Sequence, residues 1–234
     1  MADEGRKMKL SIIMPVYNEG KTLMEIYNKV KNVNIGGIEK EIIIVNDCSK
    51  DNSWKIIQGI KDKNVKKLNH EINKGKGGAI KTALKEVKGD YVIIQDGDLE
   101  YNPEEYNKLL KYINEYDIIY GSRLMGEIKG FNVPLHFIGN KILSISTSVL
   151  YGKKITDMET CYKLIRADII KNMKIDSNRF DFEPEVTARL LKSKHKIKEV
   201  PITYNCRSFE EGKKITWRDG VKALFVLFKY RFVN

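Results

Sequence analysis

The sequence predicts an α/β protein whose mostly parallel sheet is covered by helices. In the first half of the chain, β-branched runs such as "KEIIIVND" (40–47) alternate with segments of helical periodicity such as "SKDNSWKIIQGIK" (49–61). This alternation is typical of crossover units, which join parallel strands. The runs are apolar without a polar face, which indicates strands that are buried on both sides.

Each expected element follows from such a run and from the residues that bound it. The first strand, in "MKLSIIMPVYNEG" (8–20), is expected to stop at Pro15. Ser49 and Asp51 are possible caps of the second helix, and Pro103 is expected to open the fourth. We expect strands within 8–15, 40–47, 64–69, 90–96, 116–123 and 195–207. We expect helices within 20–33, 49–61, 73–89, 103–113, 131–152, 180–192 and 216–233.

No internal repeat, low-complexity tract or linker interrupts this order, so one main domain is the simplest organisation. We divide the chain into an N-terminal extension (1–8), that domain (9–216) and a C-terminal amphipathic helix (217–234). The N-terminus lacks the apolar core of a signal peptide, and no run reaches the roughly 18–20 apolar residues that span a bilayer. The 3 cysteines are widely spaced and predict reduced thiols. We therefore expect a cytoplasmic protein that lies, at most, on the inner face of the membrane.

The charge balance favours an anionic partner. Lys and Arg number 42 against 31 Asp and Glu, a formal net charge of +11. Nucleotide phosphates, nucleic acid or an acidic lipid leaflet would all suit this charge. No helix-turn-helix, zinc or RNA-recognition signature accompanies it, and the acids at 96–100 would repel a phosphate backbone, so we expect no nucleic acid. Histidines 70, 136 and 195 form no ligand pattern, and we expect surface or packing roles for them.

Acidic residues follow the strand expected at 90–96. Asp96, Asp98 and Glu100 lie in "QDGDLE" (95–100), at the carboxyl end of that strand, where open parallel sheets gather functional groups. Clustered carboxylate oxygens suit Mg²⁺ or Mn²⁺, which bridge to substrate phosphates. For an isolated D-x-D, however, a solvated strand end with helix-capping acids is the better interpretation. The metal interpretation therefore depends on companion motifs.

Such companions occur in order along the chain. They are "MPVYNEG" (14–20), "VNDCSKDNS" (45–53), "NKGKGGAI" (73–80), "GSR" (121–123), "TDMETCYKLIR" (156–166), "FDFEPEV" (180–186) and "EVPITYNCRSFEEGKKITWRDG" (199–220). As an ordered set with the acids they resemble the family 2 glycosyltransferases of GT-A fold. The resemblance covers 9–222 and is strongest to the branch that contains dolichol-phosphate mannose synthase and polyprenyl-phosphate sugar transferases.

The resemblance implies metal-dependent sugar transfer, with inversion, from a nucleotide-sugar such as GDP-mannose or a UDP-hexose. Relatives usually carry two acids at 46–47, whereas this chain has Asn46, so the base it accepts stays open. The glycine-rich turn at 73–80 fits no phosphate-loop spacing and is expected to turn the chain beside the nucleotide. The positions implied for the nucleotide pocket are Pro15, Tyr17, Glu19, Val45 and Asp47.

The family pattern also assigns the charged residues near the phosphates. Asp96, Asp98 and Glu100 would bind Mg²⁺ or Mn²⁺, although many relatives have Gln at the last position. Arg207, Lys213 and Lys214 match a basic loop that closes on phosphates in relatives. Taken alone, "EEGKK" (210–214) reads instead as a solvated loop with compensating charges.

The acceptor remains open between two chemistries. A polyprenyl or dolichyl phosphate is already ionised and needs cations that hold it in line, and Arg123 and Lys141 fall where relatives bind that phosphate. A hydroxyl acceptor would need a general base, for which Asp157 is the candidate. Arg123 could instead form a structural ion pair, Lys141 could be solvated, and Asp157 could orient the sugar or start a turn.

The C-terminal helix is basic, amphipathic and aromatic. Phe225, Phe228 and Phe232 fall near one side, with Lys222 and Lys229 elsewhere, which suits an anionic membrane interface. Packing against the domain core explains the same pattern equally well. The helix expected near 135–150 has the same two interpretations. A non-catalytic module that binds anions or membranes is the remote alternative for the whole chain.

Overall fold

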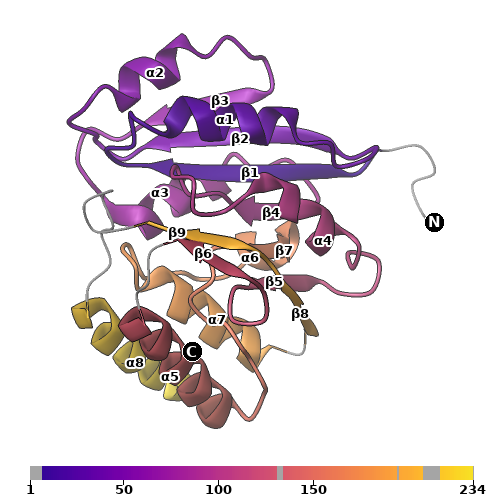
Figure 1. Cartoon of the computed structure of the whole chain (residues 1–234), viewed down its shortest axis with the longest axis vertical. Coiled ribbons are helices and arrows are strands. Elements are labelled where there is room, and N and C mark those ends of the chain that lie inside the picture. The colour runs from indigo at the N-terminus through magenta and orange to yellow at the C-terminus, as the bar shows by residue number, and fades with distance from the viewer. Residues whose placement is uncertain (1–6, 131–133, 194, 208–216, 234) are drawn as a thin grey trace.

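The computed structural model describes residues 7–130, 134–193, 195–207 and 217–233. Within these residues a seven-stranded sheet runs in the order β3-β2-β1-β4-β7-β5-β8, and β6 and β9 form a second sheet (Figure 1). The strands are β1 (Lys9–Val16), β2 (Glu39–Asn46), β3 (Val65–Asn69), β4 (Tyr91–Ile94), β5 (Ile118–Ser122), β6 (Ile128–Gly130), β7 (Lys163–Arg166), β8 (Ile197–Pro201) and β9 (Tyr204–Cys206). The helices are α1 (Leu23–Asn32), α2 (Ser53–Gly59), α3 (Gly75–Leu84), the 3₁₀ turn η1 (Pro103–Glu105), α4 (Tyr106–Leu110), α5 (Pro134–Tyr151), α6 (Ala167–Lys171), α7 (Phe182–Lys192) and α8 (Trp217–Phe232).

The predicted α/β class and the mostly parallel sheet are confirmed. β1 pairs in parallel with β2 and β4, β2 with β3, and β5 with β8. Only β7 is antiparallel within the large sheet, between β4 and β5. The carboxyl ends of β1, β2 and β4 therefore open on the same edge, as crossover connections require.

Several boundaries differ from the sequence prediction, for identifiable reasons. β1 continues through Pro15 to Val16, because β4 pairs with β1 only as far as Ile13 and requires no N–H from Pro15 on that side. The helix expected at 103–113 is a 3₁₀ turn followed by a short α4. The strand expected at 195–207 is divided between β8 and β9, which belong to different sheets. β6, β7 and α6 were not predicted, and in β7 the buried Lys163 breaks the apolar pattern.

The predicted caps of α2 have another role. Asn52 occupies the N-cap position of α2 and makes no side-chain capping bond. The Asp51 carboxylate accepts hydrogen bonds from Ser53 N and Gly20 N, both at 2.9 Å, and Ser49 Oγ accepts one from Asn18 N at 3.0 Å. These residues therefore fasten the loop that follows β1 to the start of α2.

α5 and α8 lie side by side at the end of the molecule remote from β3 (Figure 1). The inner face of α8 is buried through Ala223, Val226, Leu227 and Tyr230. The Tyr151 hydroxyl, at the end of α5, also donates a hydrogen bond to Leu227 O at 2.7 Å. The C-terminal helix thus packs on the domain, one of the two alternatives for it, while its outer face stays exposed.

Candidate active site

A cavity of about 410 Å³ opens at the carboxyl ends of β1, β2 and β4. Ligands of open α/β sheets bind at this edge. Val45, in contrast, is fully buried inside β2 and does not line the cavity. The predicted residues that do line it are Pro15, Tyr17, Glu19, Asp47, Asp96, Asp98, Glu100 and Arg207. Further lining residues, which the sequence did not assign to a nucleotide or metal site, include Asn73, Lys76, Arg179, Asp181, Tyr204, Asp219 and Lys222.

Asp47 ties the glycine-rich turn to the end of β2. Its carboxylate accepts hydrogen bonds from Lys74 N and Gly75 N, both at 2.8 Å. Asp47 Oδ1 also lies 2.7 Å from Nδ1 of the buried His70. Gly75 has φ +82°, and a Cβ there would lie 2.4 Å from Asn178 O. The turn therefore requires glycine, and His70 is a buried partner rather than a surface residue.

Each of the three predicted metal ligands has a polar partner, and Arg207 contacts two of them, Asp98 and Glu100. Asp96 Oδ1 lies 2.7 Å from Lys76 Nζ, and Asp98 Oδ2 lies 2.6 Å from the Arg207 guanidinium. Glu100 Oε2 accepts a hydrogen bond from the Tyr204 hydroxyl at 2.7 Å. Among the residues that the structure describes, no group of three or more His, Cys, Asp or Glu side chains is arranged to hold a metal ion.

Two of the carboxylates nevertheless suit a divalent ion. Burial, together with the charges of Asp96 and Glu100, raises the pKa of Asp98 to about 8. Asp98 and Glu100 are adjacent, because Glu100 N donates a hydrogen bond to Asp98 Oδ1 at 3.0 Å. Mg²⁺ is commonly held by one or two carboxylates together with substrate phosphates. The hard oxygen donors and the negative charge crowded around Asp98 fit such an ion. Asp96 is instead paired with Lys76.

Lys76 connects the cavity to a buried ion pair. Although burial opposes its charged form, Asp96, Cys161 and Glu183 raise the pKa of Lys76 well above its usual value. Its Nζ lies 3.6 Å from Glu183 Oε1, and Glu183 Oε2 lies 2.5 Å from the fully buried Lys163 Nζ. The glycine-rich turn thus places a permanent cation on the cavity wall, a role that the spacing of "NKGKGGAI" did not indicate.

Arg123 and Asp157 form a buried bidentate pair at the end of β5. The Arg123 Nε and Nη2 atoms donate to the two Asp157 oxygens at 2.7 Å, and Arg123 N donates to Oδ2 at 2.8 Å. Although burial opposes its charge, Asp157 keeps the pKa of Arg123 well above its usual value. Lys141 is exposed on α5, outside this pair. Lys213 and Lys214 lie outside the described residues.

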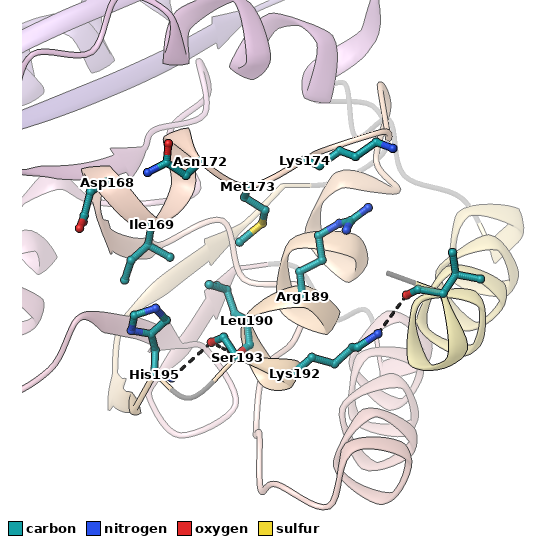
Figure 2. Close-up of a pocket in the computed structure, with 11 residues that line it drawn as sticks. Asp168, Ile169, Asn172, Met173, Lys174, Arg189, Leu190, Lys192, Ser193 and His195 are labelled. Atoms are coloured by element: carbon teal, nitrogen blue, oxygen red, sulfur yellow. Dashed lines mark hydrogen bonds between the residues drawn. The ribbon is translucent and has the colours of Figure 1, made fainter.

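A second cavity, about 490 Å³, lies between α6 and the end of α7 (Figure 2). None of the predicted site residues lines it. Two of its cations are paired: Arg189 with Glu185 at 2.8 Å and Asp176 at 3.2 Å, and Lys192 with Val233 O at 3.0 Å (Figure 2). The cavity at the strand ends, where the acids gather, is the better candidate.

A family model for glycosyl transferase family 2 matches residues 11–174. The chain belongs to glycosyltransferase family 2. This family 2 member is 31% identical over 216 residues to a dolichol-phosphate mannosyltransferase of Pyrococcus furiosus, covering 88% of this chain and 59% of that protein. It is 30% identical to a UDP-N-acetylglucosamine–dolichyl-phosphate N-acetylglucosaminyltransferase of Methanococcus voltae, over 82% of this chain and 83% of the relative.

The fold of this family 2 chain is the GT-A fold, as predicted. It superposes with a TM-score of 0.72, at 13% identity, on Mycobacterium tuberculosis glucosyl-3-phosphoglycerate synthase crystallised with Mn²⁺, UDP-glucose and phosphoglyceric acid. The match covers 98% of this chain and 81% of that one. Family membership and fold are thereby shown, and the chain has relatives named for sugar transfer to dolichyl phosphate.

Proposed function

We propose that the protein transfers a sugar, with inversion, from a nucleotide-sugar to a polyprenyl or dolichyl phosphate in a metal-dependent reaction. What supports this most directly is the cavity at the strand ends, where buried carboxylates meet Lys76 and Arg207. Anionic donors are attracted by such cations, and the three acids, which outnumber the two cations beside them, would recruit a divalent ion. The names of the relatives add the acceptor class, and they include both a mannosyl and an N-acetylglucosaminyl transferase.

Some residues of the cavity would bind the nucleoside, and others would balance the charge of the diphosphate. Pro15 and Tyr17 are positioned to line the nucleoside, and the glycine-rich turn lies beside it. Asp98 and Glu100 would hold the ion, which when bound supplies Lewis-acid neutralisation of the departing diphosphate. Arg207 already lies within 3.4 Å of Glu19 and 2.6 Å of Asp98, so its guanidinium adds positive charge at the leaving group.

The buried pair at β5 favours a phosphate acceptor over a hydroxyl. Both Asp157 oxygens accept hydrogen bonds from Arg123, so this carboxylate orients a guanidinium and is not placed to take a proton. A phosphate oxygen is already ionised near neutral pH and requires orientation rather than a base. Arg123, held rigidly at the carboxyl end of β5, is the cation that we assign to the acceptor phosphate, with Lys141 on α5 as a second.

We also propose that α8, with α5 beside it, rests on the anionic inner leaflet of the cell membrane. No helix in the described part of the chain combines the length and hydropathy needed to cross a bilayer. Lys141 is exposed on α5, and Lys229 and Arg231 are exposed on α8. Asp219 is the one acid in the sequence of the two helices. Asp219 and Lys222 also line the cavity, so a docked face would bring the cavity to the lipid headgroups. The exposed apolar side chains of the face are Ile138, Ile142, Ile145, Val149, Val221, Leu224, Phe225, Phe228 and Phe232.

Replacing Phe225 and Phe228 together by Ser is expected to weaken binding to anionic vesicles by at least about tenfold, because the aromatic area that enters the interface is lost. Co-sedimentation with phosphatidylglycerol-containing vesicles measures this binding. Ile72→Ser is the matched control, since Ile72 is 68% exposed and Phe225 69%, but Ile72 lies outside the two helices. Equal loss in both variants, or equal binding to neutral vesicles, would contradict an anionic membrane face.

Transfer of labelled sugar to a polyprenyl phosphate tests the reaction itself. A panel of GDP- and UDP-sugars is supplied with Mg²⁺ or Mn²⁺, and a chelator serves as the control. We expect glycolipid from one donor and its loss on chelation. Donor hydrolysis without glycolipid would contradict the lipid phosphate acceptor, and full transfer in chelator would contradict the metal.

A further inference from the structure

Tyr204 lines the cavity at the strand ends and also contacts the buried Arg123–Asp157 pair, which does not line that cavity. It begins β9, and its backbone N donates to Glu127 O at 2.9 Å. The side chain is buried, with the residue 8% exposed, and it also lines the cavity. The Arg123 guanidinium lies 5.2 Å from the centre of its ring, and its hydroxyl donates to Glu100 Oε2 at 2.7 Å. A single side chain thus contacts both the cation that we assign to the acceptor phosphate and a carboxylate that we assign to the ion.

Glu100 is held by β9 and the residue that follows it. Tyr204 donates to Oε2, and Arg207 N donates to Oε1 at 3.0 Å. Asn205 N donates to the Glu100 carbonyl at 2.9 Å. Donors from β9 and from Arg207 therefore orient both carboxylate oxygens of Glu100. Tyr204 is 104 residues from Glu100 along the chain. Such outer hydrogen bonds fix the direction in which a carboxylate presents its remaining lone pairs.

The ring of Tyr204 rests on a rigid aromatic support. Tyr101 contacts it edge-on at 5.0 Å between centroids, and Tyr162 packs against Tyr101 at 4.6 Å. A tyrosine hydroxyl has one proton to donate, and here its acceptor is Glu100 Oε2.

We propose that Tyr204 is a positioning residue that orients Glu100 through its hydroxyl and Arg123 through the face of its ring. The inference rests on the proposed function, in which Glu100 faces the ion and Arg123 the acceptor phosphate. Tyr204 itself need not touch either ligand. Its two contacts fix the distance between the site of diphosphate departure and the site of phosphate attack, and in-line displacement depends on that alignment.

Two substitutions separate the contacts. Tyr204→Phe keeps the ring and removes only the hydroxyl, and we expect it to weaken Mn²⁺ binding by roughly 10- to 100-fold, as loss of an outer hydrogen bond to a ligand does. The KM for polyprenyl phosphate should stay unchanged. Tyr204→Leu also removes the ring face, and should additionally raise that KM by roughly 2- to 30-fold. Electron paramagnetic resonance gives the Mn²⁺ affinity of the full chain, measured once with UDP and once with GDP. Steady-state kinetics gives the KM for polyprenyl phosphate.

Tyr106→Phe is the matched control. Its hydroxyl is buried in the same aromatic cluster and donates to Gln95 Oε1 at 2.7 Å, away from the carboxylates. Equal loss of Mn²⁺ affinity in the Tyr106 and Tyr204 variants would overturn the inference, because it would reflect general loosening. Unchanged Mn²⁺ affinity in Tyr204→Phe would overturn this inference but not the proposed function. Wild-type protein that bound no Mn²⁺ with either diphosphate would overturn the metal part of the proposed function and this inference with it.

Discussion

Replacing Asp98 by Asn is expected to lower sugar transfer by roughly 10³-fold, because the carboxylate that would face the ion and the leaving diphosphate loses its charge. Asp98 is 6% exposed, lines the cavity and contacts Arg207 at 2.6 Å. The amide has nearly the same shape and removes a negative charge from beside Asp96 and Glu100. The fold should therefore survive, with little change in the unfolding temperature. Steady-state transfer and thermal unfolding by circular dichroism measure the two effects.

Asp168→Asn is the control for this change. Asp168 pairs with Arg166 on the surface, remote from the cavity, and such pairs contribute about 1 kcal/mol or less. Its transfer rate should equal that of the wild type. Full activity in the Asp98 variant would rule out the assigned metal role, whereas loss of the folded signal together with activity would indicate a structural role for Asp98.

The second large effect concerns stability. Asp157→Ala should lower the free energy of unfolding by about 3–5 kcal/mol, because it leaves a buried guanidinium without its partner. Asp157 is fully buried, and Arg123 reaches it through two side-chain hydrogen bonds of 2.7 Å. Urea denaturation followed by circular dichroism gives the value. Asp117→Ala is the control: its contacts with Arg166 and His195 are partly exposed and should cost under about 1 kcal/mol.

A double variant separates stability from function at the same site. Replacing Arg123 by Met together with Asp157 by Leu removes both charges and refills the volume, which often restores most of the stability of a buried pair. Transfer to polyprenyl phosphate should stay lost, because the acceptor cation is absent. A double variant that folded and transferred normally would contradict the role of Arg123, and an unchanged unfolding curve for Asp157→Ala would contradict the strength of the pair.

The parallel half of the fold could be predicted from the sequence because its signals are local. Apolar β-branched runs, glycine turns and the acids after β4 each show their role within about ten residues of chain. β7 escaped prediction because Lys163 lies inside it, and a lysine is expected on a surface unless its buried partner, Glu183, is known. Short strands split by a bend, such as β8 and β9, are equally poor in local signal.

In the candidate site, too, features with a local sequence signal could be predicted and pairings between distant segments could not. The residues that carry the family motifs could be placed at the strand ends in advance, and most of them do line the cavity. Their partners could not be placed, because each pairing joins distant segments: Tyr204 with Glu100, Lys76 with Asp96, and His70 with Asp47. No periodicity connects such positions, so the orientation of each carboxylate became known only from the folded chain.

The hydrogen bonds of Asp47 limit how the donor preference of this protein can be re-engineered. A designer who wished to exchange one nucleobase for another would be drawn to Asp47, which lines the cavity that we propose for the nucleotide. Its carboxylate, however, already holds two amides of the glycine-rich turn and a buried imidazole. Any replacement would release that turn and, with it, Lys76.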